Sequence, residues 1–251
     1  MLSPNAVEIL RARYLKRNKA GEVVESPQEL FRRVARAVSV AEQRDAHLWE
    51  ERFFGLMQQG VFLPNSPTLM NAGLAEGQLS ACFVLPVGDT MQSIFETLKH
   101  TALIHQSGGG TGFNFSSLRP RGDRTGAGPG SASGPVAFMK VYDEATEQIK
   151  QGGRRRGANM GILNITHPDI RHFIECKADP SALQNFNISV GVTDRFMQAV
   201  EAGSSWTLIN PRDGRKWSEV PARELWGLLC HQARETGDPG LLFLDTINRA
   251  N

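Results

Sequence analysis

The sequence predicts an α/β protein in which an N-terminal helical region precedes a sheet or barrel of parallel strands. Two observations support this prediction. Residues 1–60 show helix-start signals and helical apolar periodicity. From residue 61 onward, short apolar runs alternate with longer amphipathic segments, a pattern typical of strand–helix–strand units. We therefore expect two regions, 1–60 and 61–251.

The composition is that of an ordinary soluble globular chain. Of the 251 residues, 40% are hydrophobic and 22% are charged, and the formal net charge is +2. That balance gives no argument for nucleic acid as a partner. The sequence contains no apolar run of the ~18–20 residues that a membrane span needs, and it begins without a signal peptide. Three cysteines fit a reducing compartment, so we expect a cytoplasmic protein.

In the first region, residues 1–25 predict a basic arm with a short helix. Ser26-Pro27-Gln28-Glu29 is a helix start, because serine can cap, proline suits the first turn and Glu29 completes a capping box. A second helix is expected over 46–59. Two prolines within 61–70 predict a tight loop that leads to the next strand.

In the second region, residues 80–86 predict a buried strand, and a helix should begin near Asp89 and end at Gly108. The glycine-rich stretch 120–134 predicts a flexible loop, followed by a helix over 135–150. The remaining expected elements are a strand at 160–165, a helix at 167–177, a strand at 186–192, a helix at 194–202, a hairpin around Asp213-Gly214, a helix at 221–236 and a strand at 240–244.

Two glycine-rich stretches could contact phosphates. Gly108-Gly109-Gly110-Thr111-Gly112 lacks the Lys-Ser/Thr of a P-loop, and it follows a helix, unlike a dinucleotide fingerprint. A helix-to-strand turn is the alternative. The stretch 151–159 places three arginines between glycines, and guanidinium groups suit phosphate oxygens. A solvated basic turn or a nucleic-acid patch are its alternatives, but the flanking glycines favour a mobile nucleotide-contacting loop.

The cysteines and histidines are the candidates for redox and metal chemistry. Cys82 is either a redox thiol on a strand or a small buried side chain. Cys176 and Cys230 lie in amphipathic segments, which favours a core position for both. The six histidines show no metal-ligand spacing, so no metal site is expected.

Several stretches occur together, in an order that resembles one family. These stretches are residues 62–73, Ser80-Ala81-Cys82, 106–113, 132–135, 151–160 and His167-Pro168-Asp169-Ile170. They closely resemble the N-terminal half of the catalytic subunit of adenosylcobalamin-dependent (class II) ribonucleotide reductases. The resemblance runs from about residue 26 to the end, and the stretches 62–82 and 151–161 are the most specific.

This resemblance implies a fold and a reaction. The family fold is a ten-stranded α/β barrel of two five-stranded halves, with a radical-forming cysteine on an internal finger loop. Residues 61–251 would then form the first half of that barrel. The reaction replaces the 2′-hydroxyl of a ribonucleotide with hydrogen. Adenosylcobalamin generates a thiyl radical, the radical takes the 3′-hydrogen, water leaves C2′, and two thiols supply the electrons.

The resemblance also assigns roles to residues. Cys82 would be one of the two reducing thiols, and Ser66 and Ala81 would contact the ribonucleotide substrate with it. Asp89 and Arg119 would bind a deoxynucleoside triphosphate or ATP effector near a homodimer interface. The stretch 151–159 would be the specificity loop, whose candidate residues are Gly153, Arg154, Arg155 and Arg156, with Arg155 the key arginine.

The radical cysteine, the second reducing cysteine and the tail cysteines of the family have no counterpart here, so we expect them beyond residue 251. The chain would then need a C-terminal half and a thioredoxin-type reductant for turnover. A non-catalytic regulatory module that binds deoxynucleoside triphosphates is the main alternative. A nucleic-acid-binding domain is disfavoured by the near-neutral charge.

Overall fold

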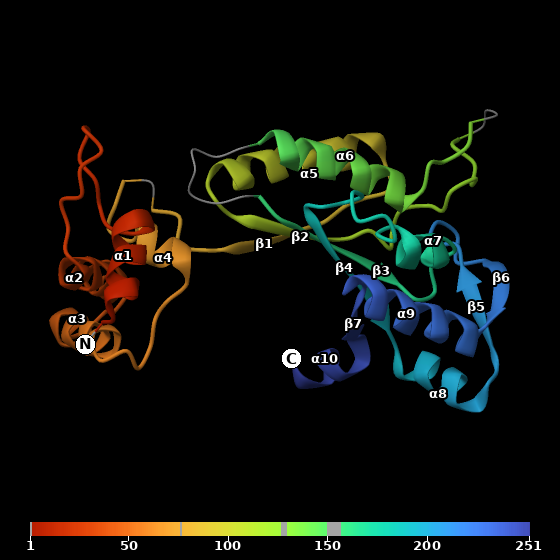
Figure 1. Cartoon of the computed structure of the whole chain (residues 1–251). Coiled ribbons are helices and arrows are strands. Elements are labelled where there is room, and N and C mark those ends of the chain that lie inside the picture. Colours follow the sequence, from red (N-terminus) through yellow and green to blue (C-terminus); the bar gives the residue numbers. More distant parts are fainter. Residues whose placement is uncertain (1, 76, 127–129, 150–156) are drawn as a thin grey trace. The chain divides into compact units, whose positions relative to one another are not determined.

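The computed structural model describes residues 2–75, 77–126, 130–149 and 157–251. The chain forms two compact units (Figure 1), Met1–Ala81 with Ser107–Gly109, and Cys82–Gln106 with Gly110–Asn251. Residues 61–81, which the sequence assigns to the second region, therefore cluster with the first unit. In the described ranges, none of the helices is both long enough and apolar enough to cross a membrane.

The first unit is entirely helical and has its own core. Its helices are α1 (Pro4–Arg13), α2 (Pro27–Ser39), α3 (Ala46–Gln58) and α4 (Ser66–Asn71). The predicted capping box at the start of α2 is confirmed, because the Glu29 amide donates to Ser26 Oγ (3.3 Å) and the Ser26 amide donates to Glu29 Oε2 (2.7 Å). Leu30 and Phe31 of α2 pack with Met57 of α3 in this core.

Helix α4 corrects the prediction of a tight loop over residues 61–70. Asn65 Oδ1 accepts a hydrogen bond from the Thr68 amide (2.9 Å), and Pro67 lies in the first turn, where a missing N–H costs nothing. At the other end, the Arg33 guanidinium donates to the carbonyls of Leu69 and Ala72. Two prolines therefore start a helix here, because one follows a capping residue and the other precedes it.

The second unit is built on a five-stranded parallel sheet. Its strands are β1 (Cys82–Leu85), β2 (Gly110–Asn114), β3 (Asn159–Asn164), β4 (Phe186–Val192) and β7 (Gly240–Phe243), and they lie in that order. Strands β5 (Ser205–Ile209) and β6 (Lys216–Pro221) form a separate antiparallel hairpin, as the sequence predicted around Asp213-Gly214. All four strand pairings in this sheet are parallel, and helices alternate with the strands, so the predicted parallel α/β class is confirmed. The sheet is open, with β1 and β7 at its edges.

The helices connect successive strands and pack along the sheet, except the last, which follows β7 and packs on the opposite face. They are α5 (Met91–Gln106), α6 (Pro135–Gln148), α7 (Ile170–Glu175), α8 (Asp194–Ala202), α9 (Ala222–Thr236) and α10 (Leu244–Ala250). Helix α5 contacts α6, α6 contacts α7, and α7 contacts α9, so the row follows the strand order (Figure 1). The sequence missed α10, because it follows β7 directly, without a turn signal between them.

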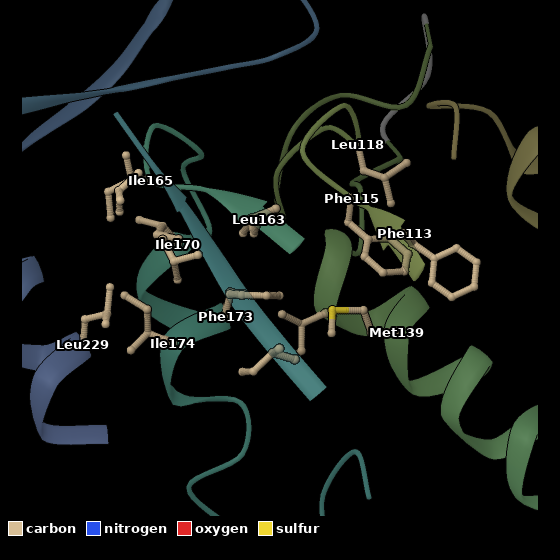
Figure 2. Packing of buried hydrophobic residues seen from close by; sticks show 14 of the residues in the cluster. Phe113, Phe115, Leu118, Met139, Leu163, Ile165, Ile170, Phe173, Ile174 and Leu229 are labelled. Atoms are coloured by element: carbon tan, nitrogen blue, oxygen red, sulfur yellow. The ribbon is translucent and has the colours of Figure 1, made fainter. Parts of the chain in front are cut away.

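The main core lies between this row of helices and the sheet. Figure 2 shows side chains from β2, α6, β3 and α7 meeting in it. Tyr142 of α6 stands edge-on to Phe113 (5.1 Å between ring centroids) and to Phe115 (5.8 Å). Its hydroxyl donates to the Ile94 carbonyl of α5 (2.6 Å), and burial raises the pKa of Tyr142 to about 12. The first turn of α5 is thus joined to the middle of α6.

The two faces of the sheet differ, and strand alternation assigns residues to each. Leu85 of β1 packs against the main core, so Cys82 and Val84 point to the opposite face. Val84 is 87% exposed, and Cys82 is also exposed. The prediction that residues 80–86 form a buried strand is therefore wrong. Strand β1 lies at a sheet edge, and its apolar residues do not all face the core.

Candidate functional site

The carboxyl end of β1 leads into a capped helix start that positions Asp89. The Thr90 hydroxyl oxygen accepts from the Ser93 amide (3.1 Å), while Ser93 Oγ accepts from the Gly88 amide (2.9 Å). These two bonds satisfy N–H groups at the start of α5 and at the turn before it. A Cβ on Gly88 would lie 2.8 Å from Ser93 Oγ, so only glycine permits this reciprocal arrangement.

Asp89 and Arg119, the predicted effector residues, form an ion pair. The Arg119 amide donates to Asp89 Oδ1 (3.0 Å), and Arg119 Nε donates to Asp89 Oδ2 (2.8 Å). Arg119 Nη1 also donates to the Arg124 carbonyl (2.7 Å). Both side chains retain 24% of their accessible surface. The pair is therefore fixed in orientation but remains open to a ligand.

The stretch 120–134 is tied down at its base, which the sequence did not predict. The Gly122 amide donates to the Ala132 carbonyl (2.9 Å), and the Ala132 amide donates to the Asp123 carbonyl (2.8 Å). A third bond joins the Thr125 amide to the Gly130 carbonyl (3.1 Å). These bonds make the two ends of the stretch a hairpin, whose residues 127–129 lie outside the described structure.

A buried carboxylate attaches this hairpin to the β5–β6 hairpin. Asp123 accepts from Arg212 Nε (2.8 Å) and Nη2 (3.1 Å), from Asn210 Nδ2 (2.9 Å), and from the Arg124 amide (2.8 Å). The Arg212 guanidinium holds the pKa of Asp123 well below its ordinary value of 3.8, and the bonds from Asn210 and Arg124 add to this effect. Asp123 is therefore ionised at neutral pH.

A cavity of about 420 Å³ lies between these elements. Its lining residues come from the start of α5, from the hairpin at 120–134 and from the start of α6; they are Asp89, Thr90, Met91, Ile94, Leu118, Arg119, Thr125, Ser131, Ala132, Ser133, Gly134 and Phe138. The volume suits a small organic ligand. Apolar side chains can contact a flat ring, while the guanidinium and the two helix N-termini favour an anion.

The predicted substrate residues are divided between the units. Ser66 begins α4 in the first unit, where its Oγ hydrogen bonds with the Tyr14 hydroxyl (3.1 Å). Ala81 is the last residue of that unit's main segment, and Cys82 is the first of the second unit. Cys82 pairs in register with Gly110 of β2. Its exposed thiol lies on the sheet face without the helix row, which a half-barrel would turn inward.

The other cysteines differ from each other. Cys176 follows α7 and packs against the main core, and burial raises the pKa of its thiol to about 12. Cys230 is exposed on α9, so the prediction that it lies in the core is wrong. An amphipathic helix also has a solvent face, and Cys230 lies on it. Within the described residues, no three His, Cys, Asp or Glu side chains gather closely enough to hold a metal ion.

The two glycine-rich stretches have different outcomes. Residues 107–109 join α5 to β2 (Gly110–Asn114). The first glycine-rich stretch is therefore the helix-to-strand turn that the sequence left open as an alternative. The specificity-loop candidates Gly153, Arg154, Arg155 and Arg156 lie outside the described residues. The description resumes at Gly157, immediately before β3.

A buried chain of polar side chains, which the sequence did not predict, lies beside that point. His105 Nε2 is 2.9 Å from Thr111 Oγ1, Thr111 Oγ1 donates to Asn159 Oδ1 (2.8 Å), and Asn159 Nδ2 donates to Thr146 Oγ1 (2.8 Å). None of the four residues is more than 5% exposed. Polar residues in otherwise apolar helix and strand faces were the available signal, but only the fold shows that they meet.

Comparison with protein families covers nearly the whole chain. Residues 1–77 match the family model described as "Ribonucleotide reductase, all-alpha domain", and residues 80–251 match "Ribonucleotide reductase, barrel domain". The boundary between these matches falls close to the boundary between the two units. The helical unit and the parallel-sheet unit thus correspond to the two matched domains.

Individual relatives agree with these matches. The chain is 51% identical, over its full length, to a vitamin B12-dependent ribonucleoside-diphosphate reductase of Mycobacterium tuberculosis strain H37Rv, of which it covers 36%. It is 46% identical to the enzyme of the same name from Thermoplasma acidophilum, of which it covers 40%. A ribonucleoside-diphosphate reductase large chain of Schizosaccharomyces pombe is 31% identical. The chain spans about two-fifths of the length of the first two relatives. It belongs to the ribonucleotide reductase family.

Proposed function

We propose that this chain acts in an adenosylcobalamin-dependent ribonucleotide reductase and supplies one reducing thiol and the effector site. The observation that carries the proposal is the exposed Cys82 residue, which points away from the main core on a strand that leads directly to the Asp89–Arg119 cavity. The names of two relatives support the cobalamin-dependent class and a ribonucleoside diphosphate as substrate.

The proposed chemistry of Cys82 is a two-electron reduction shared with a second thiol. The bond between C2′ and its hydroxyl breaks, the oxygen leaves as water, and a C2′–H bond forms. The two thiols become one disulfide, which supplies both electrons and both hydrogens. Because Cys176 is largely protonated at neutral pH and packs against the core, it is unsuited to be the second thiol.

The cobalamin itself is assigned no contact on this chain. Cobalamin is far larger than a nucleotide, and three cavities of the described residues, at about 360, 420 and 410 Å³, are each too small for a corrin ring. None of these three is lined by a histidine or cysteine. The proposal therefore concerns the thiol and the effector site, and the radical would reach the substrate from other parts of the enzyme.

The cavity is proposed to bind a deoxynucleoside triphosphate or ATP. Asp89 can accept a hydrogen bond from a ribose hydroxyl, and the Arg119 guanidinium has donors that suit phosphate oxygens. Met91 and Phe138 line the same cavity and can contact a base. The segment 150–156, which follows α6, is proposed to read the effector and to bias the choice of substrate base.

A homodimer is proposed across α5 and α6. Both helices are exposed on the side away from the sheet (Figure 1) and present large apolar side chains there. Met91, Phe95 and Leu103 of α5 and Val141 of α6 are each at least 40% exposed. Met91 also lines the cavity, so a second copy of the chain on this side would border the effector.

The test of the catalytic proposal uses the enzyme that combines this chain with the rest of its barrel. With adenosylcobalamin, a ribonucleoside diphosphate and dithiothreitol, it should form deoxyribonucleotide. Cys82→Ser should abolish this turnover, whereas Cys230→Ser, which replaces an equally exposed thiol, should retain it. Turnover by the Cys82 variant, or persistent inactivity of the folded unmodified enzyme, would contradict the proposal.

The cavity also favours a second function, that of a regulatory module without turnover. This candidate predicts stabilisation by a deoxynucleoside triphosphate, about 2.7 kcal/mol at a hundred times Kd, in an assembly that never reduces ribonucleotides. Asp89→Asn should weaken the stabilisation in both candidates. Deoxyribonucleotide formation separates them, because only the reductase produces it.

A further inference from the structure

The number of donors and acceptors on each side chain fixes the direction of every hydrogen bond in the buried polar cluster of His105, Thr111, Asn159 and Thr146. The Thr146 hydroxyl donates to the Tyr142 carbonyl (2.7 Å), so its oxygen is free to accept from Asn159 Nδ2. Asn159 Oδ1 accepts the one proton of the Thr111 hydroxyl, so Thr111 must itself accept from His105 Nε2. His105 therefore carries its proton on Nε2. Burial lowers the pKa of His105 below 6.5, which keeps the ring neutral.

These hydrogen-bonded side chains surround the backbone where the polypeptide enters β3. His105 Nδ1 has no hydrogen-bond partner among the described residues and faces Gly157. A Cβ on Gly157 would lie 2.9 Å from that nitrogen and 3.0 Å from the Thr146 methyl. The Ala158 carbonyl accepts from the Thr111 amide (3.0 Å). The backbone at 157–159 is thus enclosed by the imidazole, by Thr111 and by Thr146.

The same two helices reach the effector cavity at their other ends. Met91 and Ile94 of α5, and Phe138 of α6, line the cavity. His105 and Thr146 lie in the last turns of those helices. From Met91 to His105, α5 rises roughly 21 Å at 1.5 Å per residue. The bond from Tyr142 to the Ile94 carbonyl joins the first turn of α5 to the middle of α6, so the helices can move as one body.

We propose that His105 is a positioning residue for effector-dependent substrate choice. Through Thr111, Asn159 and Thr146, it fixes residues 157–159 against the ends of α5 and α6, so that a displacement at the cavity moves the entry to β3. The inference rests on the proposed effector function of the cavity. It adds the connection between that cavity and the backbone that follows segment 150–156.

The test measures substrate preference in the enzyme that combines this chain with the rest of its barrel. The kcat/KM ratio for a purine and a pyrimidine ribonucleotide is determined with and without each deoxynucleoside triphosphate. His105→Leu should reduce the effector-induced change in this ratio by at least about tenfold, within the range typical of allosteric coupling. The effector Kd, measured by equilibrium dialysis, should stay within about twofold because the cavity is intact.

Two further variants keep the test decisive. Thr111→Val preserves shape but removes the hydroxyl that joins His105 to Asn159, so it should reproduce the effect if His105→Leu fails to fold. His100→Gln alters an exposed histidine of the same helix and should leave the ratio unchanged. A purely structural role would lower all kcat/KM values equally and would preserve their ratio.

The outcomes separate the inference from the function on which it rests. If the unmodified enzyme neither binds deoxynucleoside triphosphates nor changes its preference, the proposed effector function fails. If it does both, and the folded His105 and Thr111 variants keep the full effector-induced change, the positioning role of His105 is refuted.

Discussion

Two polar clusters in the second unit use opposite chemistry for similar tasks. The Asp123 cluster joins the 120–134 hairpin to the β5–β6 hairpin through an ion pair with Arg212. The His105 cluster joins two helices to two strands through neutral side chains. The Arg212 side chain is 39% exposed, whereas all four members of the His105 cluster are buried.

The difference follows from the access of water to each cluster. A charge that leaves water loses its hydration, and that loss is tolerable only if the partner or the surroundings compensate. Arg212 keeps contact with solvent, so a fixed charge pair can serve at the hairpin. The four members around His105 are all buried, and neutral hydrogen bonds join them instead, with only His105 Nδ1 left unpaired among the described side chains of this cluster.

The largest expected effect comes from removing the centre of the neutral cluster. Asn159→Ala leaves the Thr111 hydroxyl and the Thr146 oxygen without their partner in a dry environment. We expect it to lower the free energy of unfolding by about 3 kcal/mol in urea denaturation. Asn187→Ala, on the exposed side of neighbouring β4, should change it by at most about 0.5 kcal/mol. Equal losses from both variants would show that burial of the cluster is irrelevant.

Disruption of the Asp123 cluster should weaken ligand binding. Asp123→Asn removes the charge that orients Arg212 and loosens the base of the hairpin that lines the cavity. We expect about a tenfold increase in the Kd for a deoxynucleoside triphosphate, as for the loss of one charged hydrogen bond. Asp213→Asn is the control, because its oxygen lies 3.6 Å from the same guanidinium. An unchanged Kd for Asp123→Asn would disconnect this cluster from the cavity.

Tyr142→Phe tests whether α5 and α6 need the hydrogen bond that joins them. The change removes only the hydroxyl that donates to the Ile94 carbonyl and keeps the ring between Phe113 and Phe115. We expect a loss of about 1 kcal/mol in the free energy of unfolding. The ring packing itself is expected to persist, which an unchanged urea m-value would support.

The smallest expected effect is that the two clusters lose their contributions to stability in different pH ranges. The pKa of His105 is below 6.5 in the folded chain, so its contribution to stability is complete above pH 6.5 and falls as the pH drops below that value. The pKa of Asp123 is lowered from 3.8, so its contribution persists above pH 3.8 and is lost below it.

Urea midpoints at pH 7, 5 and 3 measure both contributions. His105→Leu should flatten the profile between pH 7 and 5, although buried His167 titrates in the same range and keeps its own share. Asp123→Asn should flatten it only between pH 5 and 3. Identical profiles for both variants would contradict the assignment of charge to one cluster and neutrality to the other.

The sequence predicted most of the fold, because local signals determine most of its elements. The sequence predicted the capping box of α2, and it placed both ends of β4 and of α8 at or within one residue of their observed positions. The motif order also led to Asp89 and Arg119, which the structure brings into one ion pair. These features depend on residues near one another in the sequence, or on long motifs.

The missed features depend on contacts between distant segments. The exposure of Cys82 and Val84 follows from the edge position of β1, which no local pattern reveals. Asp123 and Arg212 are separated by 89 residues, and Thr111 and Asn159 by 48. The parallel pairing of β2 with β3 brings Thr111 to Asn159, and the contact between two hairpins brings Arg212 to Asp123.

The strand order also determines how the two units can fold. In the parallel sheet, Cys82 pairs with Gly110, Thr111 with Asn159, and Ser189 with Gly240, so every ladder closes a loop of tens of residues. Proteins dominated by such distant pairings fold slowly, whereas local helical contacts form quickly. On a ribosome, the helical unit can complete its core while the sheet still awaits its later strands. The order of synthesis is thus also the order of folding, from local contacts to distant ones.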